Sequence, residues 1–137
     1  MLINPYLTFD GQCGPAFQFY AKVLNGNLEA LFTFAESPAE GDVPEEFRDK
    51  IMHARLAVGD QVLMGSDCPP QVPYRGISGV SISINVDRIA EAERVFNALA
   101  DGGQVQMPLA QTFWAARFGL LVDRFGVSWM VNCEKDA

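Results

Sequence analysis

Residues 117–132 read RFGLLVDRFGVSWMVN, two apolar runs separated by the turn-like segment VDRFG. Each run is short, rich in aliphatic and aromatic residues and bounded by turn formers, which is typical of a β-strand. With residues 123–126 as the turn, Arg117 pairs with Asn132 and Trp129 faces the core. The stretch therefore predicts the closing hairpin of a sheet.

The last strand of this hairpin has a counterpart earlier in the chain. FGVSWMVNC (125–133) aligns with GDQVLMGSD (59–67), and upstream VSISINVD (80–87) aligns with INPYLTFD (3–10). Between these segments the order strand–helix–strand–strand–strand occurs twice. Such self-similarity predicts an internal duplication of a βαβββ unit.

The duplication predicts the domain organisation. Residues 1–67 form the first module, residues 68–78 with their three prolines form a linker, and residues 79–137 form the second module of one fused domain. The first strand is expected over 3–9 and its counterpart over 79–87, each with alternating apolar residues. The acidic segment 37–49 is expected to be an exposed, mobile loop and a possible lid.

Composition excludes several classes of partner. The chain has 137 residues and a net charge of −7, which disfavours nucleic acid and anionic membrane surfaces. No apolar run approaches the ~20 residues of a membrane span, and the start MLINPYLTFDG does not resemble a signal peptide. The three widely spaced cysteines predict reduced thiols and a cytoplasmic location.

Several motifs together resemble a known family. PYLTFDG, FYAKVLNG, IMHARLAVGDQVLMGSD, TFWAARFG and DRFGVSWMVN are similar to the PhnB-like branch of the vicinal-oxygen-chelate superfamily, which includes glyoxalase I, bleomycin-resistance proteins and extradiol dioxygenases. The resemblance covers nearly the whole chain. It implies an α+β fold in which paired βαβββ modules form a curved mixed β-sheet with an open cleft, and it implies a homodimer, since related proteins often dimerise.

The resemblance also implies where a metal would bind. In metal-dependent members up to four ligands lie on the concave face, at positions that correspond to Asn4, Met64, Ser81 and Met130 of this chain. Zinc and non-haem iron require histidine, cysteine or carboxylate donors. None of the four residues supplies one, and His53 is the single histidine. The sequence therefore predicts no metal and no cofactor.

Strand parity predicts the polar lining of the cleft. A two-residue turn at Gly59-Asp60 pairs Arg55 with Met64 and places His53 on the same face. The remaining expected members are Asn4, Tyr6, Ser81, Ser83, Asn85, Arg117, Met130 and Asn132. A slip of one residue in either hairpin would reverse every side chain in it.

Two arginines on one partly desolvated face would favour a carboxylate or phosphate ligand. The leading hypothesis is therefore a metal-free PhnB-like protein that binds a small polar or anionic molecule, as a binder or as a cofactor-independent enzyme. The alternatives are a metal-dependent glyoxalase- or dioxygenase-type enzyme and a drug-sequestering protein like the bleomycin-resistance relatives. Structural interpretations remain open: His53 as a hydrogen-bonded sheet residue, the arginines as surface ion pairs, and the methionines as core filler.

Some PhnB-like sequences carry a 3-demethylubiquinone methyltransferase label. A cofactor for such chemistry is usually held by a glycine-rich turn after a strand. The glycines in NGN (25–27) and DGG (101–103) instead follow predicted helices, where glycine ends a helix. Cys13 precedes a helix, which can lower a thiol pKa, but a structural thiol is favoured because no basic partner is evident.

Overall fold

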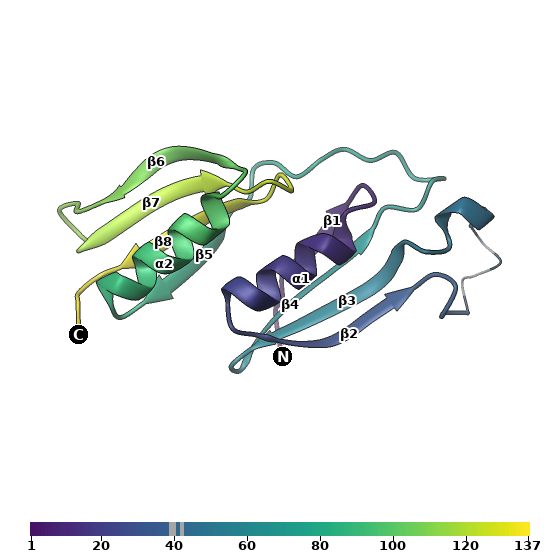
Figure 1. The fold of residues 1–137 in the computed structure, drawn as a ribbon, viewed down its shortest axis with the longest axis horizontal. Coiled ribbons are helices and arrows are strands. Elements are labelled where there is room, and N and C mark those ends of the chain that lie inside the picture. The colour runs from purple at the N-terminus through teal and green to yellow at the C-terminus, as the bar shows by residue number, and fades with distance from the viewer. Residues whose placement is uncertain (39–40, 42) are drawn as a thin grey trace. The chain divides into compact units, whose positions relative to one another are not determined.

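The computed structural model describes residues 1–38, 41 and 43–137, and these contain two successive βαβββ modules (Figure 1). The elements are β1 (Tyr6–Phe9), α1 (Cys13–Val23), β2 (Asn27–Thr33), the 3-10 helix η2 (Glu45–Phe47), β3 (Ile51–Val58), β4 (Gln61–Asp67), β5 (Ile82–Val86), α2 (Ile89–Ala100), β6 (Gln104–Ala110), β7 (Arg117–Val122) and β8 (Ser128–Cys133). The predicted α+β class and the repeated module are confirmed.

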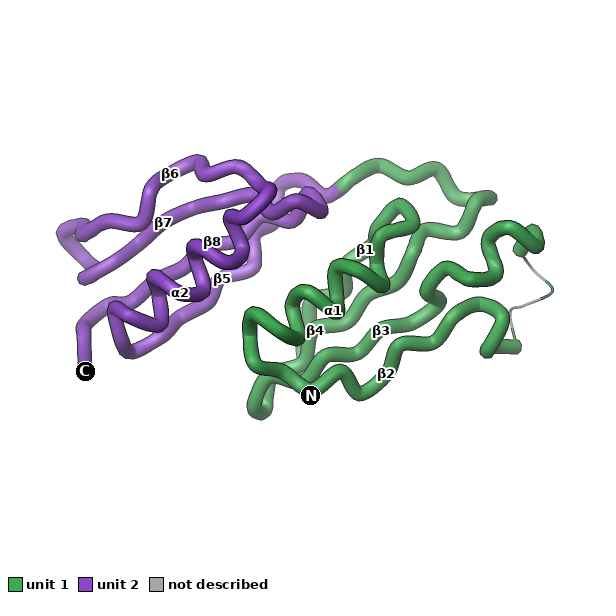
Figure 2. The backbone as a smooth tube through the Cα atoms, in the orientation of Figure 1, with its two compact units in different colours: residues 1–76 green, residues 77–137 purple. Residues whose placement is uncertain are grey.

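Each module folds into its own mixed sheet. The strand orders are β1-β4-β3-β2 and β5-β8-β7-β6. In each sheet the first strand runs parallel to the last strand of its module, and the other neighbours are antiparallel. The chain divides into the compact units Met1–Gly76 and Ile77–Ala137, and this boundary lies inside the expected linker 68–78 (Figure 2).

The first unit buries the apolar side of α1 against its sheet. Phe17 and Tyr20 of α1 are fully buried and contact each other edge to face, and Phe17 also meets Phe9 of β1. At Gly65 of β4 an added Cβ would lie 2.7 Å from the Phe17 ring, so only glycine allows this close approach of helix and strand. These three aromatic rings and Gly65 together fix how α1 lies on the sheet.

The second unit repeats this packing with different side chains. Phe96 and Leu99 of α2 are buried together with Leu121 of β7 and Trp129 of β8. Gly119 of β7 is the close-approach position here, because an added Cβ would lie 2.7 Å from the Phe96 ring. Trp129 is 1% exposed, which confirms its predicted place in the core.

The outer strands begin later than predicted. β1 starts at Tyr6 and β5 at Ile82, so the residues before them lie outside the two strands, although Pro5 O still accepts from Met64 N. Ile3 and Val80, which were expected on the core face, are 90% and 66% exposed. Alternation alone extended both strands beyond the point where a neighbouring strand can pair with them.

The acidic segment 37–49 is only partly as predicted. Residues 39, 40 and 42 lie outside the described residues, and so does the mobility expected for them. Val43 is 6% exposed, and the ring of Phe47 lies 5.3 Å from that of Phe34. The expectation that this segment has little to bury is therefore wrong for its second half.

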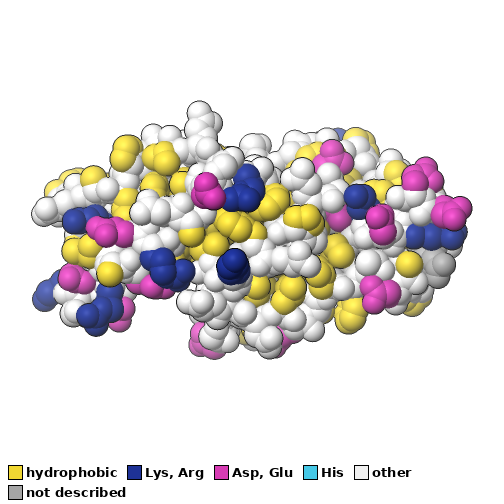
Figure 3. All heavy atoms as spheres, viewed as in Figure 1, with side chains coloured by type: hydrophobic (Ala, Val, Ile, Leu, Met, Phe, Trp, Pro, Cys, Tyr) yellow, Lys and Arg dark blue, Asp and Glu magenta, His cyan; other side chains and the backbone are white. Residues whose placement is uncertain are grey.

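None of the helices within the described residues is long and apolar enough to cross a membrane. The face of the molecule shown in Figure 3 carries acidic and basic side chains interspersed with hydrophobic ones, and the described residues form no continuous basic surface on it. This mixture of charges agrees with the net charge of −7.

Candidate functional site

The helix-free face of the first sheet carries four of the predicted site residues. Tyr6 pairs with Met64, and Met64 pairs with Arg55, as the Gly59-Asp60 turn predicted. The Tyr6 hydroxyl lies 3.3 Å from Nδ1 of His53, and the two rings are stacked. These side chains share one face because direct cross-strand partners in a pleated sheet point the same way.

Arg55 is not free to bind an anion on this face. Its Nε donates to Glu29 Oε1 at 2.9 Å, and Nη1 lies 3.9 Å from the Met64 sulfur. Both side chains of the ion pair are about two-fifths exposed, so the pair itself contributes little stability. The pair instead weakens the attraction of Arg55 for an external anion, because its guanidinium already faces a carboxylate of the same sheet.

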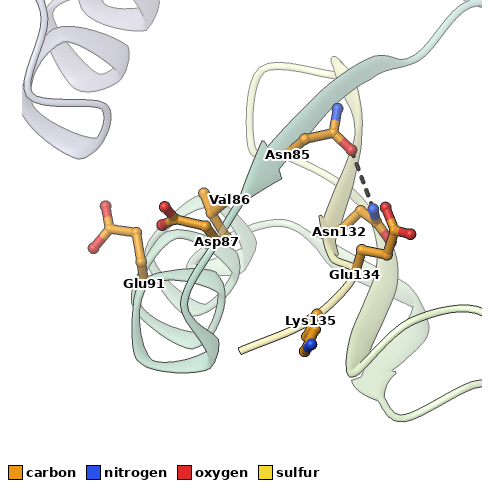
Figure 4. Close-up of a pocket in the computed structure, with 7 residues that line it drawn as sticks. All are labelled: Asn85, Val86, Asp87, Glu91, Asn132, Glu134 and Lys135. Atoms are coloured by element: carbon orange, nitrogen blue, oxygen red, sulfur yellow. Dashed lines mark hydrogen bonds between the residues drawn. The ribbon is translucent and has the colours of Figure 1, made fainter. Parts of the chain in front are cut away.

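The helix-free face of the second sheet carries a continuous polar ladder. Ser83 pairs with Met130 and Asn85 with Asn132 between the parallel strands β5 and β8. Asn132 Nδ2 donates to Asn85 Oδ1 at 3.2 Å (Figure 4). Asn85 Nδ2 in turn lies 3.5 Å from Ser83 Oγ. The structure therefore brings these four predicted residues together.

This ladder ends at a cleft of about 780 Å³. The cleft lies where β5 and β8 end, and Asn85, Asn132 and the residues that follow each strand line it (Figure 4). The members that follow the strands include three carboxylates and one amine: Asp87, Glu91, Glu134 and Lys135. Its size is in the range of small-molecule sites, and its lining is predominantly acidic.

Asn132 has an acceptor that the described residues do not satisfy. Its Oδ1 is buried and has no hydrogen-bond partner among them. The orientation follows from the ladder, because Asn85 accepts from Asn132 Nδ2 and so turns Oδ1 away from the pair. A buried acceptor without a donor costs about 1–3 kcal/mol, so a donor from a bound molecule would recover that cost.

The predicted position of Arg117 is wrong by one residue of register. Arg117 pairs with Cys133, and Asn132 pairs with Phe118. Arg117 therefore lies on the face that packs against α2, where its Nε is 3.8 Å from Glu93. Arg117 therefore does not lie on the helix-free face of its sheet, where the anion-binding residues were predicted.

The turn of this hairpin explains the error. Gly126 N donates to Asp123 O, and Gly126 has a φ of 89°. Asp123 then lies opposite Val127, which it contacts through a 2.8 Å backbone hydrogen bond. This is a turn followed by a left-handed glycine bulge, which shifts the pairing by one residue relative to a symmetric four-residue loop.

The four positions that the resemblance assigns to metal ligands do not fit a divalent metal. Asn4 and Ser81 precede the strands that were expected to include them, and Met64 and Met130 offer thioethers. The described residues contain no cluster of three or more histidine, cysteine, aspartate or glutamate side chains that could hold a metal ion. Amide, hydroxyl and thioether groups lack the charge and basicity that zinc or iron requires.

Cys13 does not have the environment of a nucleophile. Its side chain is completely buried, and burial together with the nearby Asp67 carboxylate raises the thiol pKa far above its usual value. The helix N-terminus that could have lowered this pKa is occupied, because Asp67 Oδ1 accepts from the Cys13 N–H at 2.9 Å. The structural interpretation of this thiol is thus favoured.

Comparison with known proteins decides the family. A family model described as 3-demethylubiquinone-9 3-methyltransferase matches residues 2–132. The chain belongs to this family. Together with the paired βαβββ modules, the match places this PhnB-like chain in the vicinal-oxygen-chelate superfamily.

Three relatives show how far the likeness extends. The crystal structure of protein PA1353 from Pseudomonas aeruginosa is 60% identical, covers 99% of both chains and has a TM-score of 0.93. Protein YjdN of Escherichia coli K12 is 33% identical over 98% of this chain and 97% of that protein. A putative 3-demethylubiquinone-9 3-methyltransferase, PhnB protein, from Bacillus cereus is 23% identical with a TM-score of 0.81, covering 97% of this chain and 99% of that one, and shares the fold.

The residues of this PhnB-like chain do not fit the cofactor site that the family description suggests. Both strand-to-helix junctions are closed by the protein's own carboxylates: Asp67 accepts from Cys13 N, and Asp136 Oδ1 accepts from Ile89 N at 2.9 Å. The described junctions therefore present no free glycine-rich turn for a nucleoside cofactor.

Sequence reasoning missed the acidic rim of the second-unit cleft. Asp87 directly follows β5, and Glu134 directly follows β8. The carboxyl ends of neighbouring parallel strands meet at the same edge of a sheet, so the two carboxylates had to lie close to the Asn85–Asn132 pair. The sequence predicts this acidic rim as soon as β5 and β8 are expected to pair in parallel, because each strand is followed directly by an acidic residue.

Proposed function

We propose that this PhnB-like protein binds a small polar molecule without a metal, and that the second-unit cleft is the binding site. The observation that carries the proposal is the buried, unpartnered Oδ1 of Asn132 beside the cleft. A ligand with an N–H or O–H donor would satisfy it.

The charges of the cleft favour a neutral or cationic ligand over an anion. Glu91 is already engaged by Arg94, with oxygen–nitrogen distances of 2.6 and 3.1 Å. Asp87 and Glu134 form no side-chain hydrogen bond or ion pair with the described residues. Two such carboxylates against one lysine leave a site that attracts an ammonium or guanidinium group.

The test of this cleft is a ¹⁵N-NMR titration of the full chain with benzylamine. We expect shifts of the Asn85, Asn132 and Glu134 amides, and about tenfold weaker binding for Asn132→Leu, because a net hydrogen bond contributes about 1–1.5 kcal/mol. Asn97→Leu, on the exposed side of α2, is the matched control and should bind as the wild type does. Shifts away from the cleft, or equal binding by both variants, would remove the proposal.

Native mass spectrometry of the untagged protein tests the metal-free part separately. We expect the mass of the chain without stoichiometric zinc or iron, because Asn4, Met64, Ser81 and Met130 supply none of the required donors. Stoichiometric metal that is lost on chelation, and restored by the same ion, would show that the metal-dependent alternative is correct.

We also propose that the protein forms a two-fold homodimer through β6 and the segment that follows it. From Gly102 to Ala116 the sequence has no charged residue. β6 is an edge strand, and Val105, Met107, Phe113 and Trp114 are between 42% and 96% exposed. Exposed apolar edges are normally charged or covered, and a second copy would cover this one.

Sedimentation equilibrium at micromolar concentration tests this assembly. We expect twice the chain mass for the wild type and the chain mass for the Phe113→Lys/Trp114→Lys variant, because two buried lysines would oppose the apolar contact. Phe32→Lys is the matched control: Phe32 is 48% exposed on the edge strand β2, which already carries Glu29. A monomeric wild type, or an unchanged double variant, contradicts the proposed interface.

A further inference from the structure

A second cavity lies at the corresponding end of the first sheet. It has a volume of about 370 Å³ and is formed between the end of β1 and the segment that follows β4. This segment is held in place rather than loosely attached. Cys68 N donates to Phe9 O at 2.7 Å, the Cys68 thiol lies 3.3 Å from Val72 O, and Val72 N donates to Pro69 O.

The cavity is lined by apolar surface and by a few polar groups. Val72 and Pro73 contribute apolar surface, while Thr8, Tyr74 and Arg75 bring a hydroxyl, a phenol and a guanidinium. A concave apolar site with convergent polar groups is the usual form of a small-molecule site. Nothing in the cleft of the second unit involves these residues.

Arg75 differs from most other arginines of the chain. It forms no hydrogen bond or ion pair with the described residues, although the protein carries a net charge of −7. The contrasting arginines, each with a carboxylate oxygen within 3.8 Å, are Arg55, Arg94, Arg117 and Arg124. A guanidinium without a carboxylate at the wall of a cavity is available to an external one.

Tyr74, the residue before Arg75, lines the same cavity and offers a hydroxyl donor. Burial, followed by the nearby Asp10 carboxylate, raises the pKa of its phenol, so the phenol is protonated at neutral pH. The Asp10 carboxylate acts in the opposite direction on a bound anion, because like charges repel. Arg75 thus favours an anion in the cavity, Thr8 and Tyr74 offer neutral donors, and Asp10, near Tyr74, opposes a bound anion.

From this arrangement we infer that the first-unit cavity binds a small carboxylate with an apolar body, its carboxylate on Arg75 and Tyr74 and its apolar part against Val72 and Pro73. A bidentate guanidinium–carboxylate contact supplies the orientation. The site is separate from the cleft of the second unit and does not depend on the function proposed for that cleft.

The repeat supplies an internal comparison. The aligned repeat sets Thr8 against Asn85 and Cys68 against Glu134, so the two cavities occupy equivalent ends of the two sheets. The second cleft carries Asp87 and Glu134 where a carboxylate ligand would be repelled. The same anion should therefore enter the first cavity and avoid the second.

A ¹⁵N-NMR titration of the full chain with benzoate, and in parallel with uncharged benzamide, tests the inference. We expect benzoate to shift the amides of Thr8, Val72, Tyr74 and Gly76 and to leave Asn85 and Asn132 unchanged. Arg75→Gln should weaken benzoate binding about tenfold or more, because a charged hydrogen bond is lost. Asp10→Asn should strengthen it about two- to fivefold.

The opposite signs of the two variants make the outcome decisive. Arg75 and Asp10 are both exposed, so neither substitution is expected to affect folding. Benzamide that binds as tightly as benzoate, an Arg75→Gln variant that binds like the wild type, or no benzoate shift at millimolar concentration would each overturn the inference. Failure of benzylamine at the second cleft would leave this result unaffected.

Discussion

Replacing Asp67 by alanine is expected to lower the free energy of unfolding by about 3–5 kcal/mol, because two hydrogen bonds to a buried carboxylate are lost. Asp67 ends β4 and is 1% exposed. Its Oδ1 accepts from the N–H of Cys13 at the start of α1, and its Oδ2 accepts from the N–H of Ile51 at the start of β3, each at 2.9 Å. One side chain thus joins three elements of the first unit.

Urea unfolding followed by far-UV circular dichroism measures this effect. Asp67→Asn should lose about half as much, since the amide keeps one acceptor and turns its NH₂ toward one of the two N–H groups. Asp60→Ala in the exposed turn between β3 and β4 is the control and should change stability by less than about 0.5 kcal/mol. An Asp67→Ala loss no larger than that of the control would contradict the capping role.

The first hairpin could be predicted and the last could not, for one physical reason. The Gly59-Asp60 turn has two residues, so pairing outward from it gives the observed partners, including Arg55 with Met64. The turn after β7 contains a left-handed glycine bulge at Gly126, which adds one residue to one side. Turn type is set by local backbone conformation that alternation of apolar residues does not report.

The candidate site was predictable where it depends on alternation along a strand. Ser83 and Asn85 alternate with apolar neighbours in β5, and the structure places them beside Met130 and Asn132. The prediction for Arg117 was wrong because the register set by the turn, rather than alternation within β7, decides on which face its side chain lies. Arg55 was placed on the correct face, but the bulged edge strand β2 that brings Glu29 to it gave no sign of this contact in the sequence.

The two buried aspartates show a signal that was present but not used. Leu63 and Asp67 lie four residues apart in β4, so parity already assigned the carboxylate to the core face. An acidic residue near a strand end is normally interpreted as solvent-exposed, and under that interpretation its role as a buried hydrogen-bond acceptor is missed. An aspartate with core parity at a strand end predicts buried backbone N–H groups that need an acceptor.

Asp123 is the buried carboxylate of the second unit, and it accepts three hydrogen bonds where Asp67 accepts two. Its Oδ1 accepts from the N–H groups of Phe125 and Val127 at 2.8 and 3.0 Å, and its Oδ2 accepts from Trp129 Nε1 at 2.8 Å. The first two bonds hold the bulged turn, and the third ties the turn to the core. The side chain therefore sets the register that places Asn132 on the helix-free face and Arg117 on the other.

We expect Asp123→Ala to lower the free energy of unfolding by about 4–6 kcal/mol, since three hydrogen bonds to a buried carboxylate are lost. Urea unfolding followed by far-UV circular dichroism measures it, because this signal does not depend on either tryptophan. Asp123→Ala and Trp129→Phe each remove the contact between the two side chains, so their double variant should lose less than the sum of the single losses. Additive losses would show that the carboxylate holds the turn without stabilising the indole, and the register would then depend on the two backbone bonds alone.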